Sequence, residues 1–303
     1  MVIKMIKIKF IAIGIFAVLL VSVFFFAGFT VFEFHQKNKL LADLGGKISD
    51  EAVKEKISYS LIVKDLTFPM VQLSYRQDKA VVAASLMKLP ILGAAFKAAE
   101  EGKVSLDQIV TIEVKDITGG SGVLKTMPMP HKLTLESLLE TMISASDNTA
   151  TNKLIDLLGF DYLNKVFGEL NLTETVLRRK MMDFSKRRQG VDNYTSAADI
   201  SVILESIYDK KFINCQFSDL ALKFLKKQKV NDRIPRYLPK DLTIAHKTGL
   251  ERGVVHDAGI VFLPGGDYII TVLVDKAKGY VKPKKFIAQI SRLAYNLYTG
   301  YSD

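Results

Sequence analysis

A long uncharged run of residues lies close to the N-terminus. Residues 10–32 contain no charged side chain, and Lys4, Lys7 and Lys9 precede them. A helix over this run is about 35 Å long, which is enough to cross a bilayer. A cleaved signal peptide is the competing interpretation, but its apolar region is normally shorter and ends in a small-x-small site, where this chain has bulky Phe25. We therefore expect a transmembrane helix over residues 10–32.

The charges on either side of this run predict its orientation. Lysines before a membrane span favour a cytoplasmic N-terminus, and Lys37 and Lys39 on the far side weaken that preference without reversing it. We expect a single-pass protein of the cell membrane, with residues 1–9 as a basic cytoplasmic segment and the chain after about residue 35 outside the cytoplasm. Residues 33–45 are expected to be a linker, within a polar, charged connector that reaches residue 55.

From residue 46 onward the pattern is that of a folded domain. Short segments rich in β-branched and aromatic residues, bounded by turns, predict strands over 57–66, 71–76, 243–247, 254–262 and 268–274. Apolar residues at helical spacing predict helices over 133–143, 149–158, 162–167, 196–208, 217–227 and 283–298.

This order of elements predicts an α/β fold of the α+β kind. An antiparallel sheet is built from both ends of the domain and is covered by the first and last helices, and an all-helical part spans about 100–235. The domain over 46–303 is long enough to bury a substantial core, since 49% of the chain is hydrophobic. We expect the functional site in the cleft between the sheet and the helical part, where ligand pockets commonly form.

Charge and composition exclude several classes of function. The net charge of +10 is spread along the chain without a nucleic-acid-binding motif, which indicates a basic surface attracted to an anionic cell envelope and no nucleic-acid partner. The single cysteine, Cys215, excludes an intramolecular disulfide and a cysteine-rich metal site. The four histidines stand far apart in the sequence, so we expect no metal and no cofactor. We expect a monomer.

A serine and a lysine three positions apart, Ser85 and Lys88, lie in an Ala-rich apolar run that predicts a buried helix. A serine hydroxyl attacks a carbonyl only when a neighbour takes its proton, and a lysine does this only when it is neutral. Burial and a second cation both lower the pKa of a lysine from about 10.4. Because Ser-x-x-Lys also occurs about once by chance in a chain of this length, the pair alone does not identify a site.

Two further motifs follow this pair along the chain. Ser-Asp-Asn at 146–148 lies between two expected helices, and His-Lys-Thr-Gly at 246–249 ends an expected strand. With these three motifs in this order, the chain resembles the serine penicillin-recognising enzymes, and most closely the class A β-lactamases. The resemblance runs from about residue 45 to the C-terminus, and it includes the Gly-Gly-Ser-Gly loop at 119–122 and the stretch 231–235.

The resemblance implies catalytic roles for the first two motifs. Ser85 would form the acyl-enzyme, and Lys88 would be its activating base. Ser146 would pass a proton to the leaving nitrogen, and Asn148 would contact Lys88 and the substrate amide. The residues alone also allow a simpler interpretation, in which Ser146 and Asp147 are the N-cap of the next helix.

The resemblance implies substrate binding for the third motif. Lys247 and Thr248 would bind the substrate carboxylate, and Gly249 would let the strand approach the ligand closely. The backbone N–H groups of Ser85 and Leu250 would stabilise the oxyanion. A turn at the end of a strand is the simpler interpretation of Thr248 and Gly249.

One position departs from the family pattern. In class A β-lactamases a loop glutamate is thought to activate the water that releases the acyl group, and Met181 falls where that glutamate is expected. The nearest carboxylate, Asp183, is either a general base or a residue that pins the loop through an ion pair with Arg178 or Arg179. Arg252 is a candidate for the family's additional carboxylate-binding arginine.

The resemblance implies a membrane-anchored serine hydrolase that opens the β-lactam ring through an acyl-enzyme on Ser85. A D-alanyl-D-alanine carboxypeptidase acting on peptidoglycan and a slowly deacylating penicillin-binding sensor are the alternatives. The expected partner is therefore a small-molecule β-lactam or a peptidoglycan stem peptide. Both present an acylating amide beside a carboxylate, so the motifs fit either.

Overall fold

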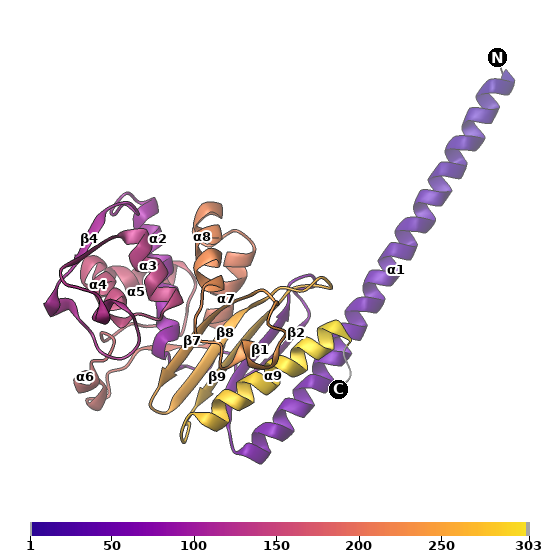
Figure 1. Cartoon of the computed structure of the whole chain (residues 1–303). Coiled ribbons are helices and arrows are strands. Elements are labelled where there is room, and N and C mark those ends of the chain that lie inside the picture. The colour runs from indigo at the N-terminus through magenta and orange to yellow at the C-terminus, as the bar shows by residue number, and fades with distance from the viewer. Residues whose placement is uncertain (1, 301–303) are drawn as a thin grey trace.

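The computed structural model describes the backbone of residues 2–300 and the side chains of residues 28 and 30–300. A five-stranded antiparallel sheet in the order β2-β1-β9-β8-β7 lies at the centre of the domain (Figure 1). The sheet joins strands from the two ends of the domain, because β1 pairs with β9 along its whole length. This arrangement confirms the predicted antiparallel sheet. The strands are β1 (Ser58–Asp65), β2 (Gln72–Tyr75), β7 (Ile244–Glu251), β8 (Val254–Val261) and β9 (Tyr268–Asp275).

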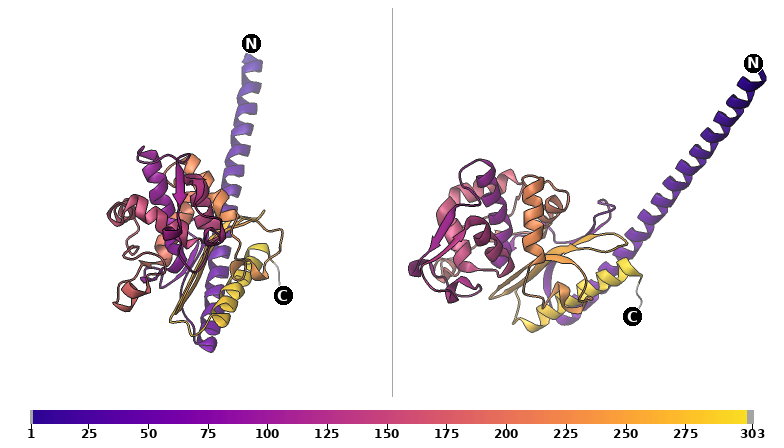
Figure 2. Two further views of the ribbon diagram at one scale, coloured as in Figure 1. Left: turned by 60° about the vertical axis from the view of Figure 1, so that its left-hand side comes forward. Right: turned by 45° about the horizontal axis from the view of Figure 1, so that its top comes forward.

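Helix α9 (Val281–Thr299) and the C-terminal part of the long helix α1 (Val2–Glu55) pack on one face of this sheet, and the N-terminal part of α1 extends away from the domain (Figures 1 and 2). Leu41, Leu44 and Ile48 of α1 are buried in the core that α9 and the sheet form on this face. The expected linker over 33–45, and the polar connector that was to continue to residue 55, are therefore wrong. Apolar residues at spacings of three and four give the helix one buried stripe among its charged positions.

The other face of the sheet carries the helical part of the domain (Figure 2). Residues 89–96 of α2 are all buried, so this helix runs through the centre of the helical part. Thr134 is the N-cap of α3, since its hydroxyl accepts a hydrogen bond from the Ser137 N–H. The helices of this layer are α2 (Lys88–Glu100), α3 (Leu135–Ser144), α4 (Asn148–Leu158), α5 (Phe160–Glu169), α6 (Phe184–Arg188), α7 (Ala197–Tyr208) and α8 (Cys215–Lys226).

Short elements complete the domain and support the loops between the helices. Two small antiparallel pairs join β3 to β6 and β4 to β5. The short strands are β3 (Val81–Val82), β4 (Ile109–Ile112), β5 (His131–Thr134) and β6 (Tyr194–Thr195). The 3-10 turns are η1 (Ala84–Met87), η2 (Val114–Asp116), η3 (Leu124–Thr126) and η4 (Ile234–Tyr237).

The membrane span expected over residues 10–32 falls for the most part on residues 1–27, which lie outside the part of the chain with described side chains. Within residues 28–300 no helix is both long enough and apolar enough to cross a bilayer.

Candidate active site

Ser85 lies in the 3-10 turn η1, which runs directly into α2 at Lys88. Three residues complete one 3-10 turn, so the two side chains lie on the same side, and Lys88 Nζ donates a hydrogen bond to Ser85 Oγ at 2.8 Å. Ala84, directly before the serine, has a positive φ of 46°, a strained conformation for a residue with a Cβ. The predicted pair is therefore in contact, at a backbone position of unusual geometry.

Lys88 is completely buried, and burial lowers its pKa to about 7. The negative charges of Asp147 and Glu251 act in the opposite direction. Its amine also donates to Asn148 Oδ1 at 2.9 Å, and so bridges the first motif to the second. A lysine with a pKa near 7 is neutral in about half of the molecules at pH 7, which is what a general base needs.

A second serine and lysine meet on the other side of the site. Lys247 Nζ donates to Ser146 Oγ at 2.9 Å and to the Thr248 carbonyl at 2.8 Å. Burial lowers the pKa of Lys247 well below its ordinary value, and the positive charges of Lys88 and Arg233 lower it further. The two lysines thus lie close enough to repel each other.

Asp147 confirms the simpler interpretation of its motif. It is the N-cap of α4, since its Oδ1 accepts from the Ala150 N–H at 2.9 Å. Its Oδ2 accepts from the N–H groups of Val123 and Leu124, so that the same carboxylate also fixes the Gly-rich loop. Ser146 has a positive φ of 53° and hydrogen-bonds to Lys247, so it is not the cap.

The Gly-rich loop packs directly against Asn148. Asn148 Nδ2 donates to the Gly119 carbonyl at 2.9 Å, and a Cβ on Gly120 would lie 2.8 Å from the same nitrogen. The loop can approach this closely only because the residue there is glycine. Asn148 is consequently held between the loop and Lys88.

Strand β7 brings the third motif beside η1. A Cβ on Gly249 would lie 3.1 Å from His256 and 3.4 Å from the Ala83 carbonyl, so the strand passes close to the turn that carries Ser85. Lys247 and Thr248 are buried, whereas the Leu250 side chain is 42% exposed at the edge of the site. The structure thus places the three predicted motifs around one site.

Asp183 has a different setting from the one expected for it. It is the N-cap of the short helix α6 and accepts from the Lys186 N–H at 3.1 Å. The alternative of an ion pair with Arg178 or Arg179 is wrong, because within the described residues Asp183 forms an ion pair with neither, and Arg179 pairs with Asp192 and Glu251.

Met181 is fixed through its backbone. Its N–H donates to Asn152 Oδ1 at 2.8 Å, and its carbonyl accepts from Asn152 Nδ2 at 3.1 Å. Asn152 itself lies on α4, one turn after the Ser-Asp-Asn motif. The position expected for the glutamate is therefore tied to the same helix as Asn148.

The site holds an arginine that the sequence analysis did not assign. Arg233 is 1% exposed, its Nε has no hydrogen-bond partner within the described residues, and its charge lowers the pKa of Lys247. Arg252, the candidate from the sequence, is exposed in the turn between β7 and β8. The stretch Asn231-Asp232-Arg233 was part of the resemblance, but only the fold shows that this arginine is buried near Lys247.

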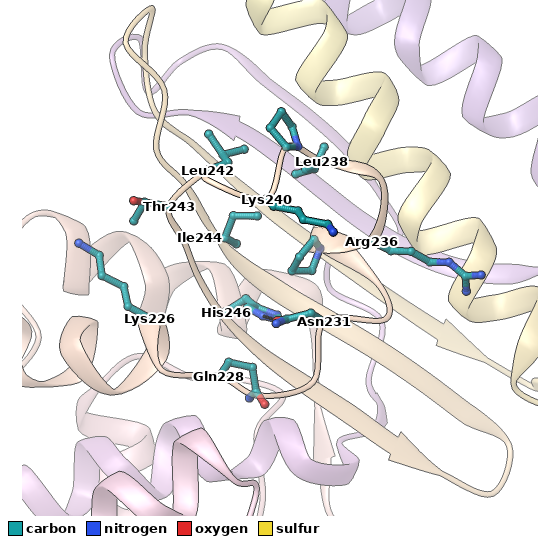
Figure 3. Close-up of a pocket in the computed structure, with 12 residues that line it drawn as sticks. Lys226, Gln228, Asn231, Arg236, Leu238, Lys240, Leu242, Thr243, Ile244 and His246 are labelled. Carbon is teal, nitrogen blue, oxygen red and sulfur yellow. Dashed lines mark hydrogen bonds between the residues drawn. The ribbon is translucent and has the colours of Figure 1, made fainter.

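A cavity of about 700 Å³ borders the site without containing it (Figure 3). His246, which precedes Lys247 in the chain, lies in its wall beside Asn231. The His246 ring contacts Asn231 Oδ1 at 3.2 Å and Asp257 Oδ1 at 2.9 Å, and Asp257 Oδ2 accepts from the Ile234 N–H. This network fixes the segment after Arg233 to β7 and β8.

Comparisons with known proteins agree with this geometry. The sequence profile of the beta-lactamase enzyme family matches residues 43–298. Beta-lactamase VEB-1 of Pseudomonas aeruginosa is 26% identical over 229 residues, 71% of this chain and 77% of that protein. The structure of the beta-lactamase from Sphaerobacter thermophilus DSM 20745 has a TM-score of 0.78 and 27% identity, covering 85% of this chain and 97% of that one.

A penicillin-binding protein is equally similar in structure. PBP-A has a TM-score of 0.78 and 30% identity, over 86% of this chain and 97% of its own. A leucine-to-glutamate mutant of PBP-A was solved as an acyl-enzyme complex with penicillin G.

Proposed function

Because the chain belongs to the beta-lactamase enzyme family and is a serine hydrolase that acts on β-lactam amide bonds, we propose that Ser85 is its nucleophile. The contact of Ser85 Oγ with the buried amine of Lys88 supports this proposal more than any other observation. As Ser85 attacks the carbonyl carbon, its proton passes to neutral Lys88, and the oxygen of the carbonyl becomes an oxyanion. The backbone N–H groups of Ser85 and Leu250 stabilise that charge.

The second pair supports collapse of the tetrahedral intermediate. Ser146 passes its proton to the leaving nitrogen and takes one from the protonated amine of Lys247, which donates to its hydroxyl at 2.9 Å. The proton that Lys88 took from Ser85 keeps the total charge of the site unchanged. Lys247, Thr248 and Arg233 bind the substrate carboxylate. That anion favours the protonated form of Lys247, whose pKa is lowered by burial and, to a smaller extent, by the positive charges of Lys88 and Arg233.

The rate of deacylation distinguishes the candidate functions. A residue that activates water contributes typically 10²–10⁴-fold to such a step, and Met181 cannot do so. Opening of β-lactams is the function we propose, with Asp183 as the candidate base. A penicillin-binding sensor or a D-alanyl-D-alanine carboxypeptidase is the second candidate, and the 30% identity to PBP-A favours it.

We further propose that the chain is anchored in the cell membrane by residues 10–32, with the N-terminus in the cytoplasm. The support is the uncharged run of 23 residues after three lysines. Protease added to intact cells is expected to digest the domain and leave the N-terminus protected. A domain that resists digestion in intact cells, or full-length protein in the soluble fraction, would contradict the anchor.

The lifetime of the acyl-enzyme tests the choice between the two functions. After a single turnover with penicillin G, the fraction of acylated protein is followed by intact-mass spectrometry in the wild type and in Met181→Glu. A β-lactamase loses the adduct within the turnover time. A sensor keeps the adduct, and its Met181→Glu variant loses it at least about ten-fold faster than the wild type. A short wild-type lifetime excludes the sensor, and a long one excludes efficient β-lactam hydrolysis.

A further inference from the structure

Four charged side chains form a closed cluster at the end of β7. Arg179 Nε donates to Asp192 Oδ1 at 2.7 Å, and its Nη2 donates to both oxygens of Glu251 at 2.8 and 3.0 Å. Arg187 binds the same Glu251 carboxylate, and its Nε lies 3.3 Å from Asp192 Oδ2. Two arginines and two carboxylates thus balance each other's charge.

This cluster joins two parts of the chain that both border the site. Arg179, Arg187 and Asp192 belong to the loop over 177–193, which carries Met181. Glu251 is the last residue of β7 and directly follows Leu250, whose N–H group is the proposed oxyanion donor. Across the cluster, Arg187 Nη2 also donates to the Arg252 carbonyl at 2.7 Å.

Glu251 is the member of the cluster that connects the two parts. Arg179 is 2% exposed and Asp192 is 5% exposed, and together they close the neck of the loop on itself. Within the described residues, the Glu251 carboxylate is the one strand group that reaches Arg179, 72 positions away in sequence. Loss of this carboxylate would leave a buried guanidinium without half of its countercharge, which is costly.

We propose that Glu251 is a positioning residue of the hydrolytic site: it holds the 177–193 loop against the end of β7, and its charge offsets those of Arg179 and Arg187 at that end of the strand. This inference rests on the proposed role of Lys88 as the base that activates Ser85. Through Glu251, the position of the 177–193 loop, the end of β7 beside Leu250 and the protonation state of Lys88 depend on one another.

The electrostatic part of the proposal has a definite sign. Lys88 is a base only when neutral, and the negative charge of Glu251 raises its pKa. Asp147 before α4 acts in the same direction, and Lys247 on β7 is the cation that faces Lys88. Removal of the Glu251 charge leaves two arginines with only the Asp192 carboxylate between them, so the cluster gains one net positive charge and Lys88 becomes neutral at lower pH. Removal of the Arg187 charge has the opposite effect.

The experiment measures the rate of acylation by penicillin G against pH in Glu251→Gln, in Arg187→Gln and in the double variant. The midpoint of the plot of acylation rate against pH reports the pKa of Lys88. We expect this midpoint to move to lower pH by about half a pH unit or more in Glu251→Gln, to higher pH in Arg187→Gln, and to return close to the wild-type value in the double variant. Glu205→Gln is the matched control, because Glu205 forms a partly buried ion pair with Lys64 elsewhere in the domain.

The rate of trypsin cleavage after Lys186 and Arg188, both exposed on α6, measures how often the 177–193 loop detaches from the end of β7. We expect Glu251→Gln to be cleaved several-fold faster than the wild type and than Glu205→Gln. Midpoints that move in the same direction in both single variants, midpoints that do not move, or an unchanged cleavage rate would overturn the proposal. A wild type that penicillin does not acylate would instead refute the proposed function. If Glu251→Gln does not fold, the direction of the shift in Arg187→Gln still decides the electrostatic part.

Discussion

Replacement of Lys88 by methionine is predicted to stabilise the protein while it abolishes acylation. The pKa of Lys88 is about 7 in the folded chain, against an ordinary value of 10.5. Each pKa unit corresponds to about 1.4 kcal/mol, so burial of this amine costs about 5 kcal/mol at pH 6, where it is protonated in both states. At pH 9 the folded chain has released the proton and the unfolded chain has not, and the cost falls to about 2 kcal/mol.

Lys88→Met removes this cost and also two hydrogen bonds, to Ser85 and Asn148, each worth about 1 kcal/mol. The variant should therefore be about 3 kcal/mol more stable than the wild type at pH 6 and about equally stable at pH 9. Relief of the repulsion with Lys247 acts in the same direction.

Urea unfolding at pH 6 and pH 9 measures this difference, with Lys97→Met as the control. Lys97 lies on the same helix but is partly exposed to solvent, so its ion pair with Glu100 contributes little to stability. A Lys88→Met protein that loses the same stability at both pH values would refute the reasoning, because the free energy of unfolding would then not depend on burial of a charged amine.

Three further predictions concern the same site. Acylation by penicillin G should become about five- to ten-fold faster from pH 6 to pH 8, since the neutral fraction of Lys88 rises from about 10% to about 90%; a flat profile in a stopped-flow assay would exclude Lys88 as the base. Asp183→Asn keeps the cap of α6, so if Asp183 is the base this variant should lengthen the acyl-enzyme lifetime about 10²-fold or more without a change in the unfolding temperature; an unchanged lifetime excludes that role. Asn152→Ala leaves the buried backbone groups of Met181 unpaired and should lower the free energy of unfolding by about 2 kcal/mol or more in a urea titration; a loss below about 0.5 kcal/mol would show that the loop does not depend on Asn152.

The sequence predicts the fold and the three motifs because the signals for both are local. Segments rich in β-branched and aromatic residues between turns predicted the long strands, and helical apolar spacing predicted most of the helices. The pairing of β1 with β9 followed from their position at the two ends of the domain. Residues 41–52 also carry a helical stripe, Leu41, Leu44 and Ile48 among them, but the many charged neighbours obscured it. A count of apolar spacings, in place of overall polarity, would have found this helix.

The electrostatics of the site could not be read from the chain. The link from Arg179 to Glu251 spans 72 positions, and nothing in the sequence indicates which carboxylate an arginine will meet. Burial of Arg233 depends on how the segment after α8 folds onto the sheet, which only the tertiary structure determines. The capping role of Asp183 is local, and an aspartate directly before a helix start was available as a signal.

The central claim is that Ser85 forms a covalent acyl-enzyme. Its most direct test is the intact mass of the purified protein after brief exposure to penicillin G and acid quenching, with peptide mapping of the adduct. We predict an increase equal to the mass of one penicillin G molecule, located on Ser85, and no increase in a Ser85→Ala variant with an unchanged unfolding temperature. An adduct of the same yield in Ser85→Ala, or one that maps to another residue, would contradict the claim.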